Sequence, residues 1–226
     1  MQILAGFFLA LLAVLPASAQ VAPSEAESRS YGGLHAAAFS GDVVDIERRI
    51  ASGENKEATD GRRRTPLHVA VYRKQHDAAR ALIRLGADPN KLEIDRYDIV
   101  TIAAVAGDVP MLKLALEGGG NPKAITSRYD GTALIAAAHL GRVEVVQTLI
   151  AAKAPLDHVN NLQWTAVIES IVLGDGGNNH TETLRALVDA GANVNIPDGS
   201  GSTPLQLAKN RGYREMVAIL EKAGAK

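Results

Sequence analysis

The sequence predicts an all-α solenoid of about six helix-turn-helix repeats joined by β-hairpin-like loops. Three observations predict it: a regular period, glycines that recur after the helices of each unit, and polar residues at outer positions of the first and last units. The residues that open successive units lie 33, 33, 34, 33 and 38 positions apart, which is typical of stacked repeat units. These opening residues are Gly32, Thr65, Asp98, Thr132, Thr165 and Thr203.

Each unit is predicted to begin with a short helix. A threonine at a helix start accepts a backbone N–H bond, and a proline after it suits the first turn because it lacks a donor. The strongest copies of this opening are Thr65-Pro66-Leu67-His68-Val69-Ala70 and Thr203-Pro204-Leu205-Gln206-Leu207-Ala208. We therefore expect a helix to start at each of these positions.

Glycines divide each unit into two helices. One follows the first helix in five units, and another follows the second helix as a left-handed cap. Neither helix buries its apolar face alone, so neighbouring units are expected to share one continuous core. The first set is Gly41, Gly107, Gly141, Gly174 and Gly212, and the second includes Gly53, Gly86 and Gly191.

The combination of openings and closings resembles the ankyrin-repeat family. The openings match its Thr-Pro-Leu-His slot, and the closings at residues 85–90 and 190–195 match its end. The resemblance implies a protein-binding scaffold that is not an enzyme. It also implies that His68 hydrogen-bonds between neighbouring hairpins.

The N-terminus resembles a Sec signal peptide. Residues 3–15 are thirteen residues without a charge, followed by Pro16 and the small-residue triplet Ala17-Ser18-Ala19. This run falls short of the roughly 20 residues that a spanning helix needs. We expect cleavage between Ala19 and Gln20 and a periplasmic or secreted protein without stable membrane insertion; an uncleaved anchor is the alternative.

The remaining chain divides into a leader and the repeat array. We assign 1–19 to the cleavable signal peptide, 20–30 to a polar leader and 31–226 to the repeat domain. Polar residues such as Arg49 and Glu221 stand where the fourth repeat has Leu149 and Ile150, so both ends read as capped and a monomer is expected. The repeats span approximately 31–60, 61–93, 94–127, 128–160, 161–198 and 199–226.

Composition narrows the function classes. Lys and Arg number 24 against 25 Asp and Glu, so no large positive field favours nucleic acid as a partner. Cysteine is absent, which excludes disulfides and thiolate chemistry. No phosphate loop, zinc motif or nucleophile triad is present, and we expect no cofactor, no metal and no catalytic residues.

The expected contact surface is the concave side that family members generally use, made of hairpin tips and the exposed ends of first helices. Aromatic residues and arginine, which dominate interface energetics, occupy many of these slots. The alternative is that the aromatics pack on adjacent hairpins. The predicted partner-binding residues are Arg62, Arg64, Tyr72, Arg73, Tyr97, Arg128, Tyr129, His139, Asn161 and Trp164.

The fifth repeat departs most from the pattern. Residues 174–180 insert about five extra residues between its helices, and Glu169 stands in a first-helix slot that is apolar elsewhere. We expect a backbone N–H or hydroxyl of the long loop to satisfy Glu169, with His180 open as a partner. The alternative function is a small-molecule or metal-binding site, conceivably hydrolytic, built from Glu169, Asp175, His180 and Trp164.

The sequence therefore predicts a non-enzymatic scaffold that binds another protein outside the cytoplasm through its concave groove. Some exported bacterial ankyrin proteins of similar size support catalases, and this chain resembles them in layout. The partner's identity stays open.

Overall fold

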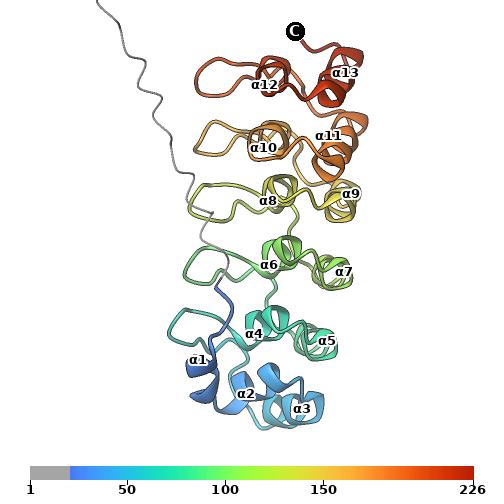
Figure 1. The fold of residues 1–226 in the computed structure, drawn as a ribbon. Helices are drawn as coiled ribbons and strands as arrows, with labels where there is room; N and C mark the ends of the chain where they lie inside the picture. Colours follow the sequence, from blue (N-terminus) through green and yellow to red (C-terminus); the bar gives the residue numbers. More distant parts are fainter. Residues whose placement is uncertain (1–20) are drawn as a thin grey trace, which may run out of the picture.

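The computed structural model describes residues 21–226, so the predicted signal peptide lies outside the described residues. Within this range the chain forms thirteen α-helices and no strand, which confirms the all-α solenoid (Figure 1). The helices are α1 (Glu25–Arg29), α2 (Gly33–Ser40), α3 (Val43–Ala51), α4 (Pro66–Tyr72), α5 (His76–Arg84), α6 (Ile99–Ala106), α7 (Val109–Glu117), α8 (Ala133–His139), α9 (Val143–Ala151), α10 (Ala166–Val172), α11 (Asn178–Asp189), α12 (Pro204–Arg211) and α13 (Arg214–Lys222).

The repeats stack into parallel rows (Figure 1). The first helices, α2, α4, α6, α8, α10 and α12, form the row beside the hairpins, and the second helices form the row behind them. The core runs along the stack between these rows, with fully buried side chains such as Leu67, Leu112 and Leu134. Each repeat therefore gains its stability by burying apolar surface against its neighbours.

The helix starts follow the predicted chemistry. In the second repeat Thr65 caps α4, accepting a hydrogen bond from the backbone N–H of His68, and Pro66 occupies the first helical position. The side chains of Asp98, Thr132, Thr165 and Thr203 cap their helices in the same way, and of these four only Thr203 is followed by a proline.

The turns between paired helices need a left-handed residue. Gly41, Gly107 and Gly212 have φ values of 78°, 67° and 71° there, a conformation that costs glycine little. Gly174 is required for a different reason. A Cβ at Gly174 would lie 2.1 Å from the Ser170 carbonyl oxygen and 2.9 Å from the His180 ring.

The hairpins are joined to one another by backbone hydrogen bonds. The amide of Ile94 donates to the Arg62 carbonyl, and the amide of Asn161 donates to the Tyr129 carbonyl, both at 2.9 Å. His68 adds a side-chain link, with its Nε2 3.0 Å from the Lys91 carbonyl oxygen, as the resemblance implied. These bonds fix each hairpin relative to the next.

The described part of the predicted leader is folded against the repeats. Residues 25–29 form α1, whose Ser24 and Glu27 make a capping box. Figure 1 shows α1 on the hairpin side of the first repeats. Within residues 21–226, no helix combines the length and apolar character that crossing a bilayer requires.

Candidate partner-binding surface

Exposed apolar side chains gather on the hairpins of the third, fourth and fifth repeats. Within residues 21–226, five of the eight exposed large hydrophobic side chains lie there. Single exposed hydrophobics are ordinary, but a concentration on adjacent loops is a candidate interaction surface. We call this set the apolar edge: Ile94, Ile125, Tyr129, Val159 and Leu162.

The hairpin tips place large polar side chains in a conformation that favours glycine. Arg63, Arg96, Asp130 and Gln163 have φ values of 60°, 65°, 51° and 62°, whereas the last hairpin has Gly201 at this place. A left-handed residue other than glycine costs stability. The chain therefore gives up stability at four tips and gains a projecting side chain at each.

Ion pairs brace the same tips. Asp95 of the third hairpin accepts from Arg62 Nη2 at 2.7 Å and from Arg128 Nη2 at 2.8 Å. It therefore joins three consecutive hairpins. Both arginine side chains remain partly exposed, at 31% and 56%, and each can still contact a partner as predicted.

The predicted aromatic residues divide between the surface and the hairpin packing. Tyr129 is exposed, but Tyr72, Tyr97 and Trp164 are only partly so. Burial raises the pKa of both Tyr72 and Tyr97, and the buried Tyr72 hydroxyl has no hydrogen-bond partner among residues 21–226. Packing on neighbouring hairpins, the alternative considered from the sequence, thus accounts for part of this stripe.

Two further predicted contacts are accessible. Arg73 is exposed, and its guanidinium lies 4.4 Å from the centroid of the Phe39 ring, a cation–π arrangement. Asn161 is exposed and donates from Nδ2 to the Arg128 carbonyl at 3.0 Å. Both stay candidates for partner binding.

Arg64 is a correction to the predicted surface, because its side chain is only 1% exposed. Its Nε donates to Asp60 at 2.7 Å, its Nη2 to Glu27 at 2.6 Å, and its Nη1 to the Val21 carbonyl at 3.1 Å. The sequence placed Arg64 in an exposed slot because the N-terminal residues that cover it lie outside the repeat pattern.

Glu169 is buried in α10, and the partners expected for it are wrong. Asn160 Nδ2 donates to Glu169 Oε1 at 3.1 Å, and His139 Nδ1 lies 3.4 Å from Oε2. These groups come from the preceding hairpin and from α8, not from the long loop. His139, predicted as a contact residue, is thereby turned partly inward.

His180 does not pair with Glu169. Its Nδ1 lies 2.9 Å from Asp175 Oδ1, and its Nε2 lies 3.0 Å from the His139 carbonyl oxygen. The insertion forms the start of α11, which places His180 against the end of α8. The hydrogen bond from His180 and the Gly177 amide also hold the pKa of Asp175 below its usual range, the amide contributing more. The acid–base pair of the alternative function is therefore absent here.

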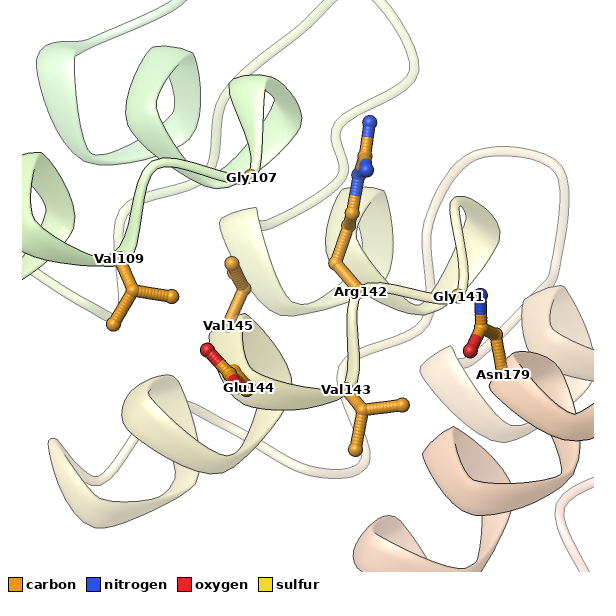
Figure 2. Close-up of a pocket in the computed structure, with 8 residues that line it drawn as sticks. All are labelled: Gly107, Val109, Gly141, Arg142, Val143, Glu144, Val145 and Asn179. Atoms are coloured by element: carbon orange, nitrogen blue, oxygen red, sulfur yellow. The ribbon is translucent and has the colours of Figure 1, made fainter.

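The described residues carry open surface depressions. One of about 370 Å³ is lined by residues of α11 and α13, and one of about 300 Å³ lies where α7, α9 and α11 begin. Figure 2 shows valines, glycines and Asn179 around it, with Arg142 and Glu144 the charged residues. Among residues 21–226, no group of three or more His, Cys, Asp or Glu side chains is placed to hold a metal ion.

Sequence reasoning missed four members of the apolar edge, because it selected mainly aromatic residues and arginine as contact residues and left aliphatic residues out. The sequence nevertheless contained one indication that an aliphatic residue at a hairpin tip is exposed. Ile94 stands in the position occupied by Gly61 and Gly199 in the second and sixth hairpins, where no buried side chain is needed.

Comparison with known proteins places this chain in a family. Descriptions of ankyrin repeats match residues 62–93, 100–198 and 176–221. A putative ankyrin repeat protein of Escherichia coli K12, YahD, is 30% identical over 190 residues, covering 84% of this chain and 94% of its own length.

Solved structures agree. A crystal structure of an ankyrin repeat domain from Acinetobacter baumannii has a TM-score of 0.82 and 42% identity, covering 85% of this chain and 98% of that one. The ankyrin repeat domain of Bcl-3 has a TM-score of 0.78 and 27% identity, covering 87% and 88%. The chain belongs to the ankyrin-repeat family, whose repeats serve as protein-interaction scaffolds.

Proposed function

We propose that this protein is a non-enzymatic scaffold that acts outside the cytoplasm and binds another protein through the apolar edge and the adjoining ends of the first helices. The observation that carries the proposal is the concentration of five exposed hydrophobic side chains on three consecutive hairpins. A partner that covers these side chains removes apolar surface from water at each repeat it touches.

The hairpins are suited to binding because they are ordered before the partner arrives. Backbone bonds link Ile94 to the second hairpin and Asn161 to the fourth, and Asp95 bridges Arg62 and Arg128. A surface that is already fixed loses little conformational entropy on binding, so more of the contact energy appears as affinity.

The proposed location rests on the sequence before the described residues. The uncharged run at residues 3–15 followed by Ala17-Ser18-Ala19 has the order of an export signal. We therefore propose an exported enzyme such as a catalase as the partner.

A paired capture experiment tests the proposal. The chain from Gln20 serves as bait in a periplasmic or secreted extract, beside a variant carrying Ile94→Ser, Tyr129→Ser and Leu162→Ser. We expect the variant to retain less than about a tenth of the captured protein, since hydrophobic anchors dominate interface energy. Its melting temperature should stay within about 3 °C, because exposed loop substitutions change stability little.

The control is Val44→Ser on α3, because Val44 is 76% exposed and lies outside the hairpins. It should capture as much as the unmodified chain. Equal capture by the edge variant and the control would show that the apolar edge is not the binding surface.

A further inference from the structure

We propose that residues 21–30, which we call the N-terminal arm, are a displaceable cover over Arg64, and that an acidic segment of the partner protein takes the arm's place. The inference rests on the proposed function in one respect, because the segment that displaces the arm belongs to the proposed partner.

The arm supplies most of the hydrogen-bond acceptors for the Arg64 guanidinium. Two of the three hydrogen bonds made by the guanidinium go to the arm, namely to Glu27 Oε1 at 2.6 Å and to the Val21 carbonyl at 3.1 Å. The third goes to Asp60, in the same hairpin as Arg64. The arm therefore shows which groups this site accepts: a carboxylate and a backbone carbonyl of one extended or helical segment.

The arm itself is weakly held. The helix α1 has five residues and buries none of them, and Pro23 alone is buried among residues 21–30. A helix this short has little stability of its own. Segments with few buried apolar contacts open at low free-energy cost, so the arm can leave while the repeats stay folded.

Two further arginines lie in the same hairpin as the covered site. Arg62 and Arg63 precede Arg64 in the same hairpin, and Arg63 is exposed with no ion pair among residues 21–226. When the arm leaves, the Arg64 guanidinium faces solvent with Asp60 as its remaining partner among residues 21–226, because Arg62 stays paired with Asp95. Guanidinium groups bind carboxylates through paired hydrogen bonds, so the uncovered site selects an acidic partner.

The arm also sets a threshold for binding. A tethered segment competes at an effective concentration of the order of millimolar. A partner segment displaces the arm only if it binds Arg64 better than Glu27 does, or if its parent protein gains additional contacts along the apolar edge. A nucleic acid would offer phosphates but no backbone carbonyl, and we take the peptide as the better fit.

The experiment measures whether opening the arm exposes the site. The probe is a fluorescein-labelled peptide with the sequence of residues 21–30, titrated against the chain from Gln20 by fluorescence anisotropy. In the Glu27→Lys variant the tethered arm no longer pairs with Arg64, so we expect the peptide to bind at least tenfold more tightly than to the unmodified chain.

Glu25→Lys is the matched control. Glu25 lies on the same helix with a side chain 92% exposed, and among residues 21–226 its carboxylate pairs only with Arg29. This variant has the same change in charge but keeps the Glu27 contact, so it should bind the peptide as weakly as the unmodified chain. Hydrogen exchange should rise for amides 24–31 in Glu27→Lys alone, while α4 stays protected.

Equal peptide affinity in the two variants would overturn the inference, as would tighter binding of a ten-nucleotide oligothymidylate than of the peptide by Glu27→Lys. Loss of α4 protection would also overturn it, because the arm would then be an integral part of the fold. These outcomes are independent of the capture experiment. The apolar edge can bind a partner while the arm stays closed, and the arm can open in a protein whose apolar edge binds no partner.

Discussion

Arg64 in the second hairpin and Glu169 in α10 are both charged side chains buried on the hairpin side of the stack, and they are accommodated in different ways. Arg64 uses three hydrogen bonds to two carboxylates and a carbonyl. Among residues 21–226 the Glu169 carboxylate accepts one hydrogen bond, from Asn160, and its buried Oε2 accepts none and lies 3.4 Å from His139 Nδ1. A buried charge is stable only when it is paired and hydrogen-bonded. We therefore expect Arg64 to stabilise the fold and Glu169 to destabilise it.

The largest effect is expected at Arg64. The substitution Arg64→Met leaves Asp60 buried without its cation, and breaking a buried pair from one side costs about 3–5 kcal/mol. Urea denaturation of the chain from Gln20 measures the change in the free energy of unfolding. A loss below about 1 kcal/mol would mean that Arg64 is no better accommodated than Glu169.

A smaller effect with the opposite sign is expected at Glu169. The substitution Glu169→Gln keeps the acceptor for Asn160 and removes the buried charge, so it should stabilise the fifth repeat by about 1 kcal/mol at pH 7. The same urea titration measures it. A destabilisation of that size would show instead that a charged pair with His139 contributes to the fold.

The smallest effect is a pH-dependent opening of the arm. The Ser24 amide and, to a lesser extent, Arg64 hold the pKa of Glu27 below its usual range. The pKa of Asp60 is also lowered, because hydrogen bonds from Tyr31 and Arg64 outweigh the opposing effect of burial. Groups with lowered folded-state pKa values stabilise above their ordinary values near 4 and lose that contribution as the pH falls through the folded values.

The Arg64 Nε–H signal in the NMR spectrum reports this opening. We expect it to stay unchanged between pH 7 and 5 and to move toward the position of an exposed arginine below about pH 4. A shift already complete at pH 6 would contradict the assignment to Glu27 and Asp60.

The sequence predicted the repeated parts of this molecule and missed those that break the repeat. The caps at Thr65 and Thr203 recur because every first helix has the same unpaired amides to satisfy, so one copy predicts the others. Arg64 was misplaced because its partner Glu27 lies before the first repeat. The partners of Glu169 were predicted wrongly because one of them, His139, belongs to the preceding repeat. The residue spacing within a repeat does not indicate which side chains of two repeats will be in contact.

The apolar edge lies between these cases. The sequence analysis expected a contact surface at the hairpin tips, and the apolar edge lies on those hairpins, but only Tyr129 among its members was named. Composition alone does not separate an aliphatic residue in a loop from one in the core. The structure distinguishes the two cases, because it shows which side chains of each hairpin are buried and which are exposed.

The backbone bonds between hairpins have a consequence for engineering. Because the amides of Ile94 and Asn161 anchor their hairpins to the preceding ones, the distance from one tip to the next is set by the main chain and not by the side chains that project from it. Projecting residues that make no ion pair with the next hairpin can then be exchanged one repeat at a time, whereas Arg62, Asp95 and Arg128 must be changed together. A family of proteins with altered partners could be assembled from this chain by substituting tips as interchangeable cassettes.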